Sequence, residues 1–420
     1  MKTRLRHVAQ VNPQSRHFDR LADDDPVPFL PMENVWTGDK LDLSQTRLKS
    51  AVSTGYTRFQ SGDIAVPKIT PTFEASRSVL IPELPDSVGT GTTELHIVRP
   101  GQEIDPRYLV YIFHSHNFLK LGEAEMYGVA GQKRVPDDFI RNWKIDLPSL
   151  DEQCRIADFL DTETARIDRL SCDQLRMIDT IEERRVAVTS HLVYGRDRDG
   201  EKRESTIGPI GPIPLTWHVL RNKTFMREVM DLSEAGDEEL LSVSHLTGVT
   251  PRSEKDVNMF LAESMVGYKR CRPGDLVINT LWAWMGALGV SQHPGILSPA
   301  YGIYRMISDV MDGKYLDLLV RTPEYVTEMT RFSKGVWTSR LRLYPESFLA
   351  LSMPVPPRSE QIQIVNQVIS ETADQERLKS KLESFAATLA ERRQALITAA
   401  VTGQFDVTTA NGQSLPGGAA

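Results

Sequence analysis

The sequence is poor in cysteine, with three in 420 residues: Cys154, Cys172 and Cys271. Their wide spacing excludes a disulfide framework and a CxxC metal site, and it is typical of a protein of the reducing cytoplasm. Long apolar runs are also missing, since the longest mostly apolar stretch, 278–290, is too short to span a bilayer. The N-terminal segment MKTRLRHVAQ is basic but is followed by no apolar region, so no secretory signal is visible. We therefore expect a cytoplasmic protein that does not enter a membrane.

Positive charge is not in excess either. The chain has 49 basic and 56 acidic side chains and a net charge of −7, which taken alone argues against a nucleic-acid partner. A count by region changes this picture. Residues 1–150 have 18 basic and 19 acidic side chains, and residues 207–356 have 15 and 16, so both segments are close to neutral. Local basic patches within them are therefore compatible with DNA binding.

The most informative feature is a long-range internal repeat. Short matching segments recur at positions that are each 208 residues apart. The matches are Glu152-Gln153 with Glu360-Gln361, Arg184-Arg185 with Arg392-Arg393, and Gly195 with Gly403. Because three matches share one distance, the segment between them repeats without insertion or deletion.

The repeated segment has helical periodicity. Each copy follows an extended, proline-containing stretch, and Asp151 or Ser359 is a plausible N-cap. Gly195 and Gly403 fall where a helix C-terminus favours a left-handed residue. The first helix is therefore predicted from about residue 152 to 194.

Both predicted helices have an apolar stripe with charged residues elsewhere, a pattern typical of a coiled-coil interface. The residues expected in it are Ile156, Leu160, Ile167, Leu170, Met177 and Ile181 in the first copy, and Ile364, Val368, Leu378, Leu382, Phe385 and Leu389 in the second. The alternative, two separate amphipathic core helices, stays open.

The two remaining large segments also resemble each other, through the pairs Gly62-Asp63 and Gly274-Asp275 and the residues before them. Short β-branched and aromatic runs broken by Gly and Pro predict a mixed α/β domain in each. The predicted order is a first globular domain at 1–150, a long helix at 151–195, a linker at 196–216, a second globular domain at 217–356, a second long helix at 357–403 and a flexible tail at 404–420.

This order constrains the architecture. The two helices bury each other's stripes only if the second returns along the first, which makes them antiparallel. The expected fold class is therefore α+β: two similar mixed α/β domains separated by two long antiparallel coiled-coil helices, with a pseudo-two-fold internal repeat.

A basic loop stands at the same place in both halves. The stretch 331–343 contains Lys334, Arg340 and Arg342 and no acidic residue, and its counterpart 126–135 contains Lys133 and Arg134. Arginine hydrogen-bonds phosphates and guanine edges, so these five residues are candidate DNA contacts. A solvated basic loop without a ligand is the alternative.

Three further residue pairs have weaker signals. Lys269-Arg270, beside the second Gly-Asp pair, is added to the candidate DNA contacts. Trp282 and Trp284 are able to stack on bases, although we expect burial of at least one in the domain core. His114 and His116 have a spacing that suits a metal, but no third ligand is evident, so a structural pair is the preferred interpretation.

Signatures of catalysis are missing. The chain contains no GxxxxGK[ST] phosphate loop and no (Asn/Asp)-Pro-Pro-aromatic motif of amino-methyltransferases. We therefore predict no catalytic residue, no metal site and no cofactor in this chain.

At this point the sequence resembles a known family. LPSLDEQCRIADFLDTETARID (147–168) and PVPPRSEQIQIVNQVI (354–369) look like the starts of the conserved regions of type I restriction–modification specificity subunits. ERRQALITAAVTGQFDV (391–407) looks like the end of their C-terminal conserved helix, and IGPIGPIPLTWHVL (207–220) resembles their entry into the second target-recognition domain. Cys154-Arg155-Ile156 departs from the small or apolar residues that are usual there.

The resemblance implies a non-catalytic subunit of a DNA adenine methyltransferase or restriction endonuclease complex. Each globular domain would be a target-recognition domain for one half of a bipartite, asymmetric site in double-stranded DNA. The helices would set the spacing and dock two methyltransferase subunits, which bind S-adenosylmethionine. Restriction subunits, which act as motor and nuclease, would join for cleavage. The alternatives are a stand-alone coiled-coil protein-interaction scaffold and an autonomous nuclease or methyltransferase.

Overall fold

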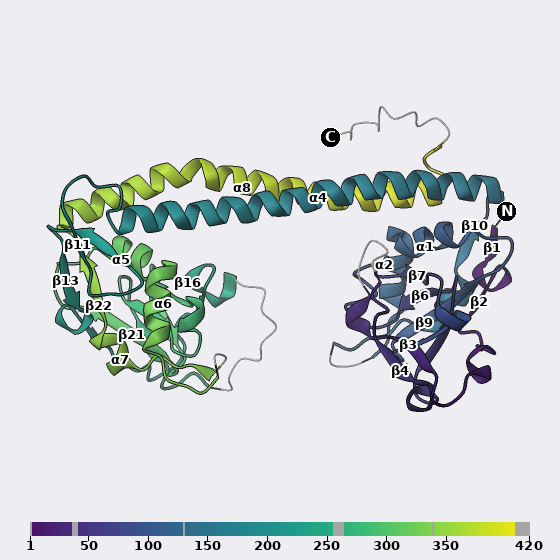
Figure 1. Cartoon of the computed structure of the whole chain (residues 1–420), viewed down its shortest axis with the longest axis horizontal. Helices are drawn as coiled ribbons and strands as arrows, with labels where there is room; N and C mark the ends of the chain where they lie inside the picture. Colours follow the sequence, from purple (N-terminus) through teal and green to yellow (C-terminus); the bar gives the residue numbers. More distant parts are fainter. Residues whose placement is uncertain (1, 36–40, 129–130, 255–263, 338–339, 408–420) are drawn as a thin grey trace. The chain divides into compact units, whose positions relative to one another are not determined.

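The computed structural model describes residues 2–35, 41–128, 131–254, 264–337 and 340–407. Most of the tail predicted at 404–420 lies outside these residues. The chain forms two compact units. Unit 1 comprises Met1–Arg176 and Leu382–Ala420, and unit 2 comprises Met177–Lys381. Each unit therefore contains one globular region together with a part of each long helix (Figure 1).

The two long helices are α4 (Leu150–Val193) and α8 (Arg358–Val401), with 44 residues each. In unit 1, Arg393 of α8 binds Asp168 of α4 at 3.0 Å, and in unit 2, Lys379 of α8 binds Glu182 of α4. The higher residue number on α4 pairs with the lower residue number on α8, so the helices run antiparallel. The two numbers of each pair add up to 561, so both pairs belong to one register. The predicted fold class is confirmed.

Each long helix ends in the same glycine motif. Gly195 and Gly403 have φ values of 61° and 71°, in the left-handed region. After Gly195, the Arg196 N–H donates to the His191 carbonyl, and after Gly403, the Gln404 N–H donates to the Ala399 carbonyl, both at 2.9 Å. This six-residue closure satisfies helix carbonyls that would otherwise lack donors.

Within the described residues, the globular part of unit 1 contains two four-stranded sheets, a two-stranded ribbon and three α-helices. One sheet is antiparallel with the order β2 (Ala9–Val11), β9 (Leu95–Pro100), β6 (Ile64–Pro67), β7 (Val79–Leu80). The other has the order β4 (Thr46–Leu48), β3 (Pro26–Leu30), β8 (Val88–Gly91), β5 (Thr57–Gln60), in which β3 and β8 are parallel. The ribbon pairs β1 (Lys2–Arg4) with β10 (Lys144–Asp146). The helices are α1 (Pro106–His114), α2 (His116–Glu125) and α3 (Asp137–Asn142).

Unit 2 repeats this plan with smaller sheets. Its four-stranded sheet has the order β14 (Met226–Glu228), β21 (Tyr301–Met306), β18 (Leu276–Asn279), β19 (Leu288–Val290). Two-stranded pairs are β13 (His218–Arg221) with β22 (Ser352–Val355), β15 (Leu241–Ser244) with β16 (Gly248–Pro251), and β17 (Lys269–Cys271) with β20 (Gly295–Leu297). The helices are α5 (Gly313–Val320), α6 (Pro323–Arg331) and α7 (Pro345–Ala350).

The core of each unit joins the globular helices to both long helices. In unit 1, α1 packs in one apolar cluster with Leu160 of α4 and Ile397 of α8. In unit 2, α5 packs in one cluster with Val193 of α4 and Ile364 of α8. Since fully burying such a side chain stabilises by about 1.5–3 kcal/mol, the long helices are integral parts of both units.

The repeated Gly-Asp pairs build a buried ion pair in each unit. The Asp63 carboxylate accepts from Arg99 Nε and Nη2 at 2.7 and 2.8 Å, and the Asp275 carboxylate accepts from Arg305 Nε and Nη2 at 2.7 Å each. Both carboxylates are 1% exposed. The Gly62 and Gly274 φ values of 80° and 90° make the turns that present them. The sequence match therefore marks a structural device of the domain core.

The segment predicted as a linker, 196–216, is packed rather than free. It folds into the hairpin of β11 (Lys202–Glu204) and β12 (Pro212–Pro214). Ile207, Ile210 and Ile213 are each at most 2% exposed and belong to the core of unit 2. These isoleucines, set among Gly and Pro, are what distinguish the segment from a solvated tether.

Candidate nucleic-acid interface

The ends of the basic loops predicted in both halves pair in the same way. In unit 1, Tyr127 and Arg134 pair through two backbone hydrogen bonds of 3.2 and 2.9 Å. In unit 2, Lys334 and Arg342 pair through two of 2.9 Å. Each loop connects the second and third helices of its globular region, α2 to α3 or α6 to α7. We call their described residues, 127–128 with 131–134 and 334–337 with 340–342, the hairpin loops.

Arg134 is held at the base of the first hairpin loop. Its Nε and Nη2 atoms donate to the two carboxylate oxygens of Glu94, each at 2.8 Å. The hydrogen bond from Arg134 is the main cause of the lowered pKa of Glu94. The Arg134 side chain is 37% exposed, so it combines a fixed position with access to solvent. Lys133 beside it is exposed.

The second hairpin loop presents its charge over an aromatic ring. The Arg342 guanidinium carbon lies 6.0 Å, and the Lys334 ammonium nitrogen 5.8 Å, from the centre of the Tyr344 ring. Lys334 and Arg340 are exposed, and Arg342 is half-buried. Two buried or half-buried arginines thus stand at the same end of the two loops, with an acidic partner in unit 1 and an aromatic one in unit 2.

The candidates Lys269 and Arg270 are placed differently from the loops. Lys269 is 7% exposed, and its Nζ donates to the Tyr301 carbonyl at 2.8 Å, so it is not available as a phosphate contact on the surface. The alternation of strand β17 explains this, since it turns Lys269 inward and Arg270 outward. Arg270 donates to Glu238 at 2.7 Å, and the pKa of Glu238 is lowered to about 2, mainly by its hydrogen bond from Ser233 and then by Arg270.

A hollow lies beside the hairpin loop in each unit. The hollow of unit 1 has a volume of about 540 Å³ and that of unit 2 about 150 Å³. Their linings include equivalent positions: the first residue of β5 or β17, the residue after β6 or β18, and the first residue of β9 or β21. These residues are Thr57, Lys68 and Leu95 in unit 1, and Lys269, Thr280 and Tyr301 in unit 2.

The hollows adjoin the loop arginines. Arg342 itself lines the hollow of unit 2. In unit 1, the Val135 N–H, next to Arg134, donates to the carbonyl of the lining residue Lys68 at 2.8 Å. The unit 1 hollow also contains Asn12, whose amide nitrogen lies 3.2 Å from His96 Nδ1. Sequence reasoning missed Lys68 and Asn12, because only the pairing of distant strands brings them to the loop.

Exposed tryptophans lie in unit 2. Trp282 and Trp284 stack with ring centres 6.4 Å apart and an interplanar angle of 16°. Trp282 is 51% exposed and Trp284 is half-buried, so the expectation that one of them is buried in the core is wrong. Trp337, on the hairpin loop, is 68% exposed. These rings offer flat surfaces for bases.

The residues predicted for the coiled-coil interface divide into three groups by their exposure. The ends of the stripe are buried: Ile156, Leu160, Ile167, Ile364, Val368 and Leu389 are at most 5% exposed. Ile181 and Leu382 are half-buried. The remaining four, Leu170, Met177, Leu378 and Phe385, are 44–50% exposed, because two helices alone cover only one side of such a residue.

His114 is buried in unit 1 and hydrogen-bonded to the backbone. The His114 ring is 2% exposed, and its Nε2 donates to the Ser78 carbonyl at 2.7 Å. Burial lowers the pKa of His114 to about 4. Across the described ranges, no group of three or more His, Cys, Asp or Glu is placed to hold a metal ion. In the same ranges no helix is long and apolar enough to cross a membrane.

Comparison with solved structures identifies the class of fold. The chain shares its fold with a protein from a study of complex assembly and conformational transition in the type I R-M system, with a TM-score of 0.70 and 18% identity. The match covers 96% of this chain and 98% of the other. The HsdS subunit from Thermoanaerobacter tengcongensis matches with a TM-score of 0.45 and 18% identity over 96% of this chain and 97% of that one.

Sequence comparison then gives two relatives that match part of the chain. The chain is 44% identical over 158 residues to the type I restriction enzyme EcoAI specificity subunit of Escherichia coli, and 37% identical over 177 residues to the EcoEI specificity subunit. These matches cover 37% and 42% of this chain but only 26% and 29% of the relatives. No protein-family model matches the chain. Over less than half of its length, the chain is therefore similar in sequence to two type I restriction enzyme specificity subunits.

Proposed function

We propose that the chain is the DNA-reading subunit of a type I restriction–modification complex, in which each globular region reads one half of a bipartite, asymmetric site. The observation that carries this proposal is the duplicated face: both units place an arginine-bearing hairpin loop beside a hollow. Two similar but unequal faces suit two unequal half-sites. The side chains of these faces differ, which is what different base sequences require.

The first contacts to test are the loop residues. Lys133, Arg134, Lys334, Arg340 and Arg342 remain the proposed DNA contacts, since each is exposed or half-buried. Arg134→Ala is expected to weaken recognition of one half-site only, and Arg342→Ala recognition of the other. A bidentate contact of arginine with a guanine contributes about 1–3 kcal/mol, so the loss at the affected half should be roughly 5- to 150-fold.

The measurement is methylation of plasmids in which one half-site at a time is changed. Arg377→Ala is the matched control, because this exposed arginine lies on α8, outside both globular regions, and pairs with Asp374 of its own helix. Equal loss at both halves for either loop variant would contradict one globular region per half-site.

We further propose that the long helices set the spacing of the half-sites and dock two methyltransferase subunits. Large apolar side chains in the middle of both helices support a docking role, because they stay half-exposed in this chain. They are Leu170, Leu175, Met177, Leu378 and Phe385, with exposed fractions of 44–59%. Helices of a partner that lie along them would complete a bundle.

Chemistry is assigned to the partners. The methyltransferase subunits would bind S-adenosylmethionine and methylate adenine, and restriction subunits, where present, would supply translocation and cleavage. The purified chain should then show no metal-dependent or S-adenosylmethionine-dependent activity. Such activity would instead favour an autonomous enzyme.

The near-neutral charge of the globular regions fits an assembly in which partners contribute phosphate contacts. The isolated chain should bind DNA weakly, and its complex with the methyltransferase should show a much steeper dependence of affinity on salt. Tight, sequence-specific binding by the lone chain would count against this division of labour. The second candidate function, a stand-alone coiled-coil scaffold, is favoured if the chain purifies from its native cells without a methyltransferase.

A further inference from the structure

A fully buried glutamine stands in the first turn of α4. Gln153 is 0% exposed, and all of its side-chain hydrogen bonds reach backbone atoms. Its Oε1 accepts from the Asp105 N–H at 2.8 Å. Its Nε2 donates to the carbonyls of Glu103 at 3.1 Å and Pro148 at 3.0 Å. One side chain therefore ties the beginning of the long helix to the segment that leads into α1.

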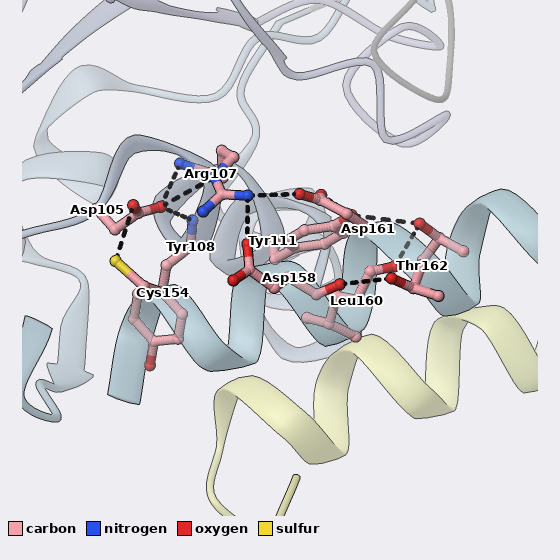
Figure 2. Close-up of polar contacts among 10 residues, drawn as sticks. Asp105, Arg107, Tyr108, Tyr111, Cys154, Asp158, Leu160, Asp161 and Thr162 are labelled. Atoms are coloured by element: carbon pink, nitrogen blue, oxygen red, sulfur yellow. Dashed lines mark hydrogen bonds and ion pairs between the residues drawn. The ribbon is translucent and has the colours of Figure 1, made fainter. Parts of the chain in front are cut away.

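The same segment starts α1. The Asp105 carboxylate accepts from the N–H groups of Arg107 and Tyr108 at 2.9 and 3.0 Å and so caps the helix (Figure 2). Tyr108 then donates its hydroxyl to the Val401 carbonyl at 3.2 Å, in the last turn of α8. Through Gln153 and Tyr108, α1 is joined to the start of one long helix and to the end of the other. We call this set of hydrogen bonds the joint.

Unit 2 contains the same joint with the roles of the long helices exchanged. Gln361 of α8 is 0% exposed, accepts from the Asp312 N–H at 2.6 Å and donates to the carbonyls of Val310 and Pro356 at 2.7 and 2.8 Å. Asp312 caps α5. Tyr315 of α5 donates its hydroxyl to the Val193 carbonyl of α4 at 2.9 Å.

The ion pairs between α1 and α4 are not duplicated at the matching positions of α8. In unit 1, Arg107 binds Asp158 and Asp161 at 2.7 and 2.9 Å (Figure 2). At the positions 208 residues later, α8 has Asn366 and Ile369, which offer no carboxylate. The buried amide joint is thus the part of the attachment that both units share, whereas the more exposed ion pairs differ between them.

The choice of an amide is informative. An apolar side chain would fill the same buried volume without hydrogen bonds, whereas three directional hydrogen bonds fix distance and angle together. Gln174 of the same helix offers a contrast. It is 5% exposed, and neither of its amide atoms has a hydrogen-bond partner within the described residues. Burial of glutamine alone therefore does not make a joint.

We infer that Gln153 and Gln361 are positioning residues, each of which fixes the angle between its globular region and the long helices. The biological meaning of this inference rests on the proposed function, because a defined angle matters for reading half-sites at a set spacing. The angle itself is a property of the free chain and is measurable without DNA.

The first experiment measures that angle. Spin labels are attached to the native Cys172, exposed on α4, and to a cysteine introduced by Glu83→Cys, exposed in the globular region of unit 1, in a Cys154→Ser background. Electron–electron distance measurements should give one narrow distribution for this parent. Gln153→Met keeps the side-chain volume but loses the hydrogen bonds, and it should at least double the width or shift the distribution. Helix content should remain that of the parent.

The matched control is Gln174→Met, which replaces a buried glutamine of the same helix and should leave the distribution unchanged. Tyr108→Phe removes one hydroxyl and is the substitute test variant if Gln153→Met fails to fold. It should widen the distance distribution by less than is expected for Gln153→Met. A folded Gln153→Met protein with the parental distribution would overturn the inference. If Gln153→Met does not fold, a Tyr108→Phe protein with the parental distance distribution would also overturn the inference.

The second experiment reads function in the full chain with its co-expressed methyltransferase. Plasmids contain the same half-sites at the native spacing and with one base pair added or removed. Gln153→Met should relax the preference for the native spacing at least several-fold, whereas Gln174→Met should not. Unchanged spacing preference in the folded Gln153→Met complex would contradict the inference. If the parental complex methylates no bipartite site, the proposed function fails. The distance measurement still tests whether Gln153 fixes the angle between its globular region and the long helices.

Discussion

Acidification gives a sharp test of how unit 1 is packed, through the buried His114. Its ring donates Nε2–H to the Ser78 carbonyl, and its Nδ1 has no partner within the described residues. Burial lowers its pKa from 6.5 to about 4, so the folded chain holds the ring neutral. Between these two pH values the unfolded chain binds more protons than the folded chain, and the free energy of unfolding must therefore fall as the pH is lowered.

The magnitude follows from the two pKa values. At pH 7 the contribution is close to zero, and at pH 5 the unfolded histidine is mostly protonated while the folded one is mostly neutral. The resulting loss between pH 7 and pH 5 is about 2 kcal/mol. The measurement is native-state hydrogen exchange of the slowest amides in β6 and β9, which report the unfolding of unit 1.

His114→Gln is the matched variant, because an amide nitrogen preserves a donor toward Ser78 and does not titrate. The stability of this variant should fall by about 2 kcal/mol less than that of the parent over the same pH range. All other titrating groups, including the buried His96, are common to both proteins and cancel in the comparison. An equal pH dependence in the two proteins would refute the account of His114.

Two further predictions concern stability, and both are checked by urea unfolding. Gly403→Ala should cost about 1–2 kcal/mol for the left-handed backbone alone, since no atom lies within 4 Å of the added methyl group. Gly195→Ala should cost roughly 2–4 kcal/mol, because the methyl group would also lie 2.8 Å from the Trp217 ring; equal costs would contradict the packing of this corner. Arg99→Ala should cost about 3 kcal/mol, because it leaves the buried Asp63 carboxylate without its charge partner, and a loss below 1 kcal/mol would show that water replaces the guanidinium.

The long helices and their direction could be predicted from the sequence. Their periodicity, the constant distance between matched residues and the two terminal glycines all act locally or through simple chain geometry. The same reasoning overestimated the burial of residues in the middle of the stripe, such as Leu170 and Phe385. A heptad pattern reports which face is apolar, and it does not report how many helices cover that face.

The candidate interface was predicted only in part. The hairpin loops were found because they combine basic residues with a repeated position. Lys269 was misjudged, because its inward direction depends on the register of β17 with β20. The hollows, and residues such as Lys68, depend on strands that are distant in sequence. The matching Glu-Gln pairs were recognised as a repeat, but the bonds of Gln153 to the turn before α1 required the structure.

We propose that the two similar globular regions each specify one half of a single DNA site. The most direct measurement is sequencing of methylated bases in cells with and without this gene. We expect an adenine-methylated motif in two parts, separated by a fixed number of unspecified base pairs, that disappears with the gene. Deletion that leaves every methylated motif in place, or removes only a motif with a single uninterrupted part, would contradict it.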